Sequence, residues 1–223
     1  MKDVVISLGG SMIVPQKIDS SLLKNLVHII NEHVQKGNRV VLICGGGYTC
    51  RWYQDAARKL GVQNKADLDW IGIRATHLNA ELVRSLFPEA YEKVISNPTE
   101  KITTKKKIIV GCGWVPGFSS DMDAIQIAEN LNISVIINLT NVEYVYDKDP
   151  KKFKDAKPKK NLSWKELQVI VGKKWTPGAH FPFDPKATVY AQKTKPTLYI
   201  IKGTLQNIKN LLEGKKVNGT VVT

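Results

Sequence analysis

The chain has 223 residues, with 33 basic and 20 acidic side chains and a formal net charge of +13. Hydrophobic residues make up 43% and charged residues 24%, which is typical of a folded globular protein and excludes wholesale disorder. The longest apolar run, residues 40–44, is far shorter than the roughly 18 residues of a membrane span. Three cysteines predict no disulfide framework. With no secretory signal at its start, we expect a cytoplasmic protein without a membrane partner.

In chain order, short apolar runs alternate with segments of helical period. The first expected strand, 3–8, ends in Gly9-Gly10-Ser11, and the first helix starts at Asp19 and ends at Gly37. A second strand, 39–44, is followed directly by three glycines. The later expected elements are helices over 48–60, 66–86, 120–131, 163–171, 184–193 and 205–212, and strands over 90–95, 107–110, 133–139, 197–202 and 220–223. This alternation predicts an α/β layered fold with a mostly parallel sheet. We expect one domain over residues 1–223, with a linker or surface excursion at 147–161 and a loose division near residues 110–120 as the alternative.

The excess of lysine is compatible with anionic partners, although a solvated lysine-rich surface is the more ordinary explanation, because the lysines are spread along the chain. The densest cluster, 148–160, contains one aromatic residue, Phe153. A groove for single-stranded nucleic acid needs stacking rings between its charges, so we expect no nucleic-acid partner. The histidines and cysteines, His180 included, show no metal-ligand spacing, so we expect no metal held by the protein itself.

Three glycine turns follow expected strands: Gly9-Gly10-Ser11, Gly45-Gly46-Gly47 and 111–117. Ligands of parallel sheets bind at the carboxyl ends of the strands, where glycine lets backbone amides approach an anion closely. One such turn is more often a plain connection, but three together indicate a site for several phosphates. The Walker A, dinucleotide and protein-kinase signatures are absent, so a different phosphate-binding architecture is required.

Two further segments carry polar side chains that suit a nucleotide. In 113–121, Ser119 or Ser120 is a predicted N-cap, and the same helix start could bind a phosphoryl group. Asp121 could there orient a lysine or a metal ion. Segment 140–150, with polar ends and two tyrosines, suits a base and a ribose, or is a surface turn.

Short motifs in a fixed order extend over nearly the whole chain. They are Gly9-Gly10-Ser11, Gly45-Gly46-Gly47 with Arg51, Asp69 with Gly72, Thr76 and Asn79, Pro116-Gly117 with Ser119-Ser120-Asp121, Thr140-Asn141-Val142, Tyr146 with Asp149-Pro150, and Phe183-Asp184-Pro185. Together they resemble the amino acid kinase family, and within it the uridylate (UMP) kinases of the archaeal type. The resemblance implies a three-layer αβα sandwich around a sheet of about eight strands. It also implies magnesium-assisted phosphoryl transfer from ATP to UMP in pyrimidine biosynthesis, and a homo-oligomer, commonly a hexamer.

The resemblance also implies a role for each matching residue. On the ATP side stand Gly9, Gly10, Ser11, Gly47, Arg51, Thr140, Asn141, Tyr146 and Asp149. On the UMP side stand Gly46, Asp69 for the ribose hydroxyls, and Trp114, Val115, Pro116, Gly117, Phe118, Ser119 and Ser120 around the phosphate. Arg51 and Asp121 are the expected catalytic residues.

The chain departs from the family pattern at several positions. Ser7 stands where many members have a lysine, which the archaeal type also lacks, and Cys112 stands where a second glycine is usual. Tyr144 replaces a glycine, and tyrosine adopts a positive φ only at a cost. Trp114 and Phe118 are bulkier than the usual residues. Two alternatives therefore stay open: a kinase of the same fold for another small phosphate or carboxylate, and a nucleotide-binding relative without turnover.

The lysine that reaches the transferring phosphoryl group is not fixed by the motifs. Lys148, Lys186 and the run 105–107 are the candidates.

Overall fold

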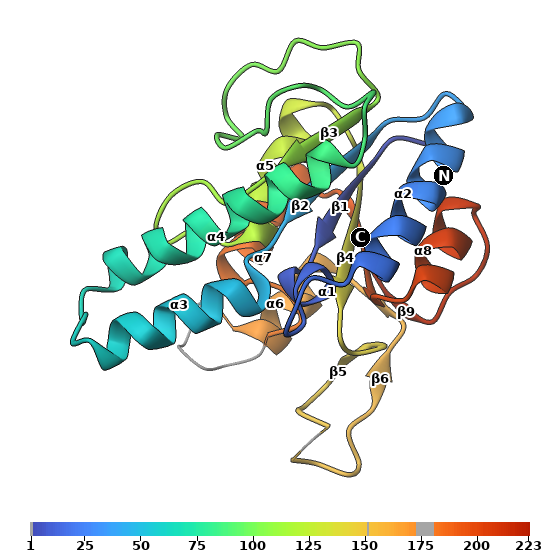
Figure 1. The fold of residues 1–223 in the computed structure, drawn as a ribbon. Coiled ribbons are helices and arrows are strands. Elements are labelled where there is room, and N and C mark those ends of the chain that lie inside the picture. The colour runs from blue at the N-terminus through green and yellow to red at the C-terminus, as the bar shows by residue number, and fades with distance from the viewer. Residues whose placement is uncertain (1, 151, 173–180) are drawn as a thin grey trace.

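A seven-stranded sheet with helices on both faces forms the centre of the molecule (Figure 1). The structure is a computed structural model that describes residues 2–150, 152–172 and 181–223. In spatial order the strands are β3 (Ile108–Gly111), β2 (Val40–Cys44), β1 (Val4–Leu8), β4 (Val135–Thr140), β8 (Thr197–Lys202), β9 (Gly219–Val222) and β7 (Asn161–Leu162). The first five are parallel, and β9 runs antiparallel to β8. The αβα sandwich is thus confirmed, with seven strands in place of about eight.

The central strands are continuous apolar runs because both of their faces are covered. Every residue of β1, β2 and β3 is buried. The register pairs Val4 of β1 with Val40 of β2, and Val5 with Ile136 of β4. Since the strands are parallel, their carboxyl ends lie on one edge of the sheet, and the glycine turns follow there.

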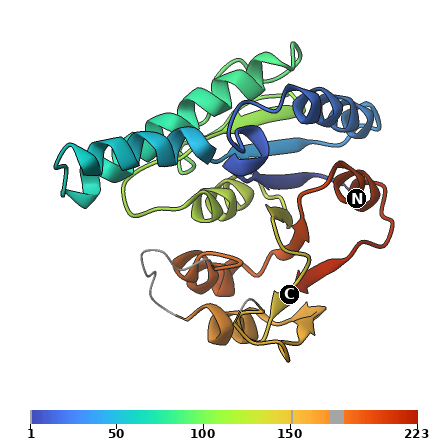
Figure 2. The same ribbon diagram turned by 60° about the horizontal axis from the view of Figure 1, so that its bottom comes forward.

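The helices form two layers, each with its own apolar cluster (Figure 2). The eight helices of the described residues are α1 (Gly10–Ile13), α2 (Ser20–Gln35), α3 (Gly47–Lys59), α4 (Lys65–Ser85), α5 (Ser120–Asn130), α6 (Trp164–Val171), α7 (Pro185–Thr194) and α8 (Leu205–Leu212). Helices α1, α2, α4 and α8 pack on the face that shows Val4, Ile6 and Leu8. Helices α5, α6 and α7 pack on the opposite face with Val5. Helix α3 lies beside α4 (Figure 1).

The structure corrects some of the expected elements. Residues 90–95 are not a regular strand: Tyr91 and Ile95 donate backbone hydrogen bonds to β3, at 2.8 Å each, but the chain bends between them. Only an isolated bridge, Ile95 to Gly111, remains. Helix α1 and the two-residue strands β5 (Val145–Tyr146), β6 (Pro158–Lys159) and β7 were not predicted, because such short elements show no hydrophobic period.

The expected surface excursion at 147–161 contains most of a two-stranded hairpin, β5 with β6, that projects from the body (Figure 1). Lys151 of the lysine cluster and His180 lie outside the described residues. Within the described ranges, no helix combines the length and the apolar character that crossing a membrane requires.

Candidate active site

The turns after β1 and β2 are in direct backbone contact. A Cβ atom placed on Gly10 would lie 1.9 Å from the backbone nitrogen of Gly47, so this approach excludes any side chain. The N–H of Gly45 donates to the Leu8 carbonyl at 3.1 Å. Gly47 has a φ of +62°, which favours glycine. The two turns therefore form one backbone surface, beside the start of α3, that a phosphate group could approach closely.

The neighbouring motif residues lie on the same surface. Gly46 is the N-cap of α3, where a Cβ would lie 2.5 Å from that of Cys50. Ser11 is exposed in α1, and Arg51 is exposed on α3 with its guanidinium 5.9 Å from the Tyr48 ring centroid. The hydroxyl and the guanidinium are thus available at the rim of the glycine turns.

Helix α4 fixes the second turn against the loop that follows β3. The side chain of Asn79, only 4% exposed, donates to the Gly45 carbonyl at 2.8 Å. The hydroxyl of Thr76 accepts the Gly113 N–H at 2.8 Å, and His77 Nε2 donates to the Gly113 carbonyl at 3.1 Å. Burial lowers the pKa of His77, which keeps the ring neutral. Thr76 and Asn79 belong to a matched motif without an assigned role, and nothing in the sequence pointed to His77.

The loop after β3 is held at its tip by α4 again and by α7. The Gly117 N–H donates to Asp69 Oδ2 of α4 at 3.1 Å, and Lys186 Nζ of α7 donates to the Gly117 carbonyl at 3.3 Å. Gly117 has a φ of +84°. The Trp114 and Phe118 rings pack edge to face, with centroids 5.3 Å apart.

The rest of this loop leads into α5. Residues 115 and 118 close a turn, in which the Phe118 N–H donates to the Val115 carbonyl at 3.2 Å, around Pro116. Ser119 is the N-cap of α5 and accepts the Met122 N–H at 3.3 Å, and Ser120 is the first helical residue. The predicted cap is thus confirmed. The start of α5 adds backbone N–H groups to the same side of the site.

Asp121 links three elements at the centre of this edge. Its carboxylate accepts the Ser7 hydroxyl of β1 at 3.4 Å and the Asp184 backbone N–H at the start of α7 at 2.9 Å. Burial raises the pKa of Asp121 to about 7, and the nearby Asp184 charge adds to that rise. Among the described residues, the oxygens of Asp121 contact a hydroxyl and a backbone N–H. A lysine or metal partner for Asp121 stays a prediction.

Asp123, one turn into α5, is a second buried acid, and no motif in the sequence singles it out. Its side chain is 1% exposed, and neither oxygen has a hydrogen-bond partner. Burial raises its pKa to about 7. The nearby backbone N–H of Trp114 lowers the pKa of Asp123 in part, although it does not form a hydrogen bond of ordinary geometry with the carboxylate.

The segment after β4 lies at the next strand end. Thr140 donates to the Val142 carbonyl at 2.9 Å, and Asn141 and Asp149 are exposed. Tyr146 pairs with Pro158 in the hairpin. In the part of the chain that the structure describes, the non-glycine residues with positive φ are Asn132 and Lys195, so Tyr144 needs no strained backbone.

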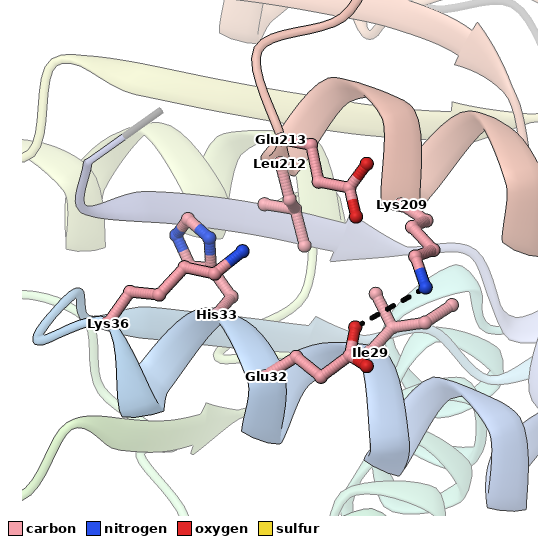
Figure 3. Close-up of a pocket in the computed structure, with 7 residues that line it drawn as sticks. All are labelled: Ile29, Glu32, His33, Lys36, Lys209, Leu212 and Glu213. Carbon is pink, nitrogen blue, oxygen red and sulfur yellow. Dashed lines mark ion pairs between the residues drawn. The ribbon is translucent and has the colours of Figure 1, made fainter.

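Two hollows lie away from this edge. One, between α2 and α8, is lined by Ile29, Glu32, His33, Lys36, Lys209, Leu212 and Glu213 (Figure 3). Its volume of about 10 Å³ leaves room for one water molecule at most, so it is no substrate site. The other, about 260 Å³ between α2 and α4, is lined mainly by apolar side chains.

Comparison with known proteins agrees with this geometry. A sequence model described as "Amino acid kinase family" matches residues 2–202, and the chain belongs to that family. The chain is 35% identical to a uridylate kinase of Staphylothermus marinus, over 98% of this chain and 97% of the relative. It is 34% identical to a uridylate kinase of Thermoplasma volcanium, over 96% and 94%.

Solved structures with the same fold also superpose on this chain. The crystal structure of uridylate kinase from Archaeoglobus fulgidus superposes with a TM-score of 0.86 and 35% identity, covering 100% of both chains. The crystal structure of UMP kinase from Bacillus anthracis superposes with a TM-score of 0.76 at 21% identity, which supports the fold alone.

Proposed function

We propose that this protein is a uridylate kinase, which transfers the γ-phosphoryl group of ATP to UMP and releases UDP and ADP. The observation that carries the proposal is the contact between Asp69 Oδ2 and the Gly117 N–H, at 3.1 Å. It joins a carboxylate suited to ribose hydroxyls to the tip of a loop suited to phosphate. An acceptor with both groups, a nucleoside monophosphate, matches that pair. The similarity to uridylate kinases identifies the base as uracil.

On the donor side, we propose that Gly9, Gly10, Ser11 and Gly47 surround the ATP phosphates. The support is the close backbone contact between their turns, which leaves no room for a side chain at Gly10 or Gly47. Thr140, Asn141, Tyr146 and Asp149 would hold the adenosine end, since they follow the neighbouring strand β4. Arg51 would neutralise charge on the transferring oxygens.

On the acceptor side, we propose that Asp69 binds the ribose, and that Gly46 and the loop from Trp114 to Ser120 surround the UMP phosphate. Asp121 would act as a positioning residue, because its oxygens already hold Ser7 and the start of α7. Phosphoryl transfer needs in-line placement and charge neutralisation more than covalent help. The acceptor phosphate is itself largely ionised near neutral pH, so the proposal requires no strong general base.

Magnesium would arrive with ATP. Among the described residues, no group of three histidine, cysteine or acidic side chains is arranged to hold a metal ion. Mg²⁺ commonly keeps several waters and binds through substrate phosphates with few carboxylates, so the proposal needs no metal site built from protein side chains alone. When bound, it would neutralise charge on the transferring group.

The proposal also covers the domain organisation, the cellular location and the oligomeric state of the protein. We propose one domain over residues 1–223, since both apolar clusters pack on the same sheet, and a single unfolding transition would test it. We propose a cytoplasmic location, which three cysteines without a disulfide suit. We propose a homo-oligomer, a hexamer by resemblance, and the apolar hollow between α2 and α4 supports a contact surface. Light scattering after gel filtration would measure its mass.

A coupled assay for ADP tests the activity directly. ATP with Mg²⁺ and UMP is expected to give ADP and UDP, and other nucleotides or small carboxylates far less. Failure with UMP while another acceptor works would point to a different kinase of this fold. Binding without any turnover would point to a non-catalytic relative. The variant Arg51→Ala is expected to lower kcat strongly.

The proposed role of Asp69 in binding the ribose can be tested against a matched control variant on the same helix. Asp69→Asn is expected to raise the KM for UMP about 10- to 100-fold, because a charged hydrogen bond contributes about 1.5–3 kcal/mol. Asp67→Asn removes the same charge two residues earlier, from an exposed position, and should stay close to the wild type. Equal effects of the two variants would contradict the assignment.

A further inference from the structure

Lys186 holds the acceptor loop from the side opposite Asp69. It is the second residue of α7, and its ammonium group donates to the Gly117 carbonyl at 3.3 Å. Gly117 donates its own N–H to Asp69 of α4 at 3.1 Å. Helices α4 and α7 belong to opposite layers of the sandwich, so the tip of the loop bridges the two layers.

The other candidate lysines are paired with acidic side chains or lie at the opposite end of the strands from the glycine turns. Lys148 lies 2.6 Å from Asp155 and over the Phe153 ring at 5.2 Å. Residues 105–107 precede β3, so they lie at the amino end of a parallel strand, the edge opposite the glycine turns. Lys106 pairs there with Glu89 at 3.4 Å.

The environment of Lys186 is suited to an anion. Its side chain is exposed, and the ion pairs found among the described residues do not include it. Its contact is a neutral carbonyl, and an ammonium group is attracted more strongly to an anionic phosphate oxygen, because both partners are then charged. A phosphate arriving at the loop would therefore take the ammonium group from Gly117.

We propose that Lys186 is a ligand of the acceptor phosphate, and that Lys186 and Asp69 together hold Gly117 when no acceptor is bound. The inference rests on the proposed function. Without acceptor, the two side chains hold the Gly117 N–H and carbonyl. The ribose hydroxyls of the acceptor displace the N–H from Asp69, and its phosphate displaces the carbonyl from Lys186. An acceptor with only a ribose or only a phosphate breaks one of the two hydrogen bonds to Gly117. Productive binding therefore requires both groups.

The test compares Lys186→Met with Lys193→Met, two variants of the same helix that lose the same charge. Lys193 is exposed in the last turn of α7. Binding of UMP is measured by calorimetry, and KM for UMP and for ATP by the coupled assay. Lys186→Met is expected to raise the UMP dissociation constant about 10- to 100-fold. The KM for ATP should change less than about twofold. Lys186→Arg should restore most of the affinity, and Lys193→Met should match the wild type.

Two results would overturn the inference. One is UMP affinity of Lys186→Met within about twofold of the wild type. The other is a parallel loss of UMP and ATP binding, which would indicate general damage to the fold. A wild-type protein that neither binds nor phosphorylates UMP would instead refute the proposed function, and so the two failures are distinguishable.

Discussion

Replacing Asp123 is expected to stabilise the protein, by an amount that grows as pH rises from acid towards neutral. The carboxyl is 1% exposed, neither oxygen has a hydrogen-bond partner, and burial raises its pKa from 3.8 to about 7. The charge of Asp121 contributes to that rise. In the unfolded chain the group ionises freely, so folding must desolvate an anion or take up a proton.

The magnitude follows from linkage between proton binding and folding. A rise of about three pKa units corresponds to about 4 kcal/mol of lost stability above pH 7. Because the folded pKa is the higher one, the penalty is absent below the unfolded pKa and grows as pH rises from about 4 to 7. Asp123→Ala removes it, and the small void left behind costs about 1 kcal/mol. The net gain at pH 8 is about 3 kcal/mol, or a Tm higher by about 6–12 °C.

Thermal unfolding of wild type and Asp123→Ala between pH 4 and 8 measures this gain. The difference is expected to shrink steadily towards acid pH and to vanish or change sign near pH 4. Asp67→Ala, which removes an exposed acid from the first turn of α4, serves as the control and should show no such trend. A variant less stable than the wild type at pH 8, or a difference independent of pH, would show that the carboxylate has a favourable partner.

Three further predictions concern the glycine-rich edge. Asn79→Ala leaves the buried Gly45 carbonyl unpaired and should lower the free energy of unfolding by about 1–3 kcal/mol in urea titrations. Gly10→Ala places a Cβ 1.9 Å from backbone and should abolish measurable ATP turnover, whereas Gly61→Ala, with open space around its Cβ, should cost about 1 kcal/mol of stability and leave turnover intact. Thr76→Val removes the acceptor of a loop N–H and should raise the KM for UMP more than that for ATP; the reverse order would contradict its position.

The parts of this site that the sequence predicted are those set by local rules. Continuous apolar runs followed by glycines indicate buried parallel strands with their turns at one edge. Gly10 and Gly47 confirm the reason for those glycines, since a Cβ on either would meet backbone of the other turn. Ser119 capped α5 as its position before the helix indicated.

The parts that the sequence could not predict depend on contacts between distant residues. Asp121 accepts a hydrogen bond from the hydroxyl of Ser7, which is 114 positions away. The link between Asp69 and Gly117 joins residues 48 positions apart through the packing of α4 against the sheet. Lys186 was one candidate among several lysines, and only the placement of α7 distinguishes it from the others.

The most direct test of the central claim is a crystal structure with UMP and an unreactive ATP analogue bound together. The account predicts the triphosphate against the turns after β1 and β2, with Arg51 near its end. It predicts the UMP ribose at Asp69 and the UMP phosphate in the loop around Gly117, within reach of the γ-phosphorus. Nucleotides bound at other places, or phosphates separated by the Trp114 and Phe118 rings, would contradict it.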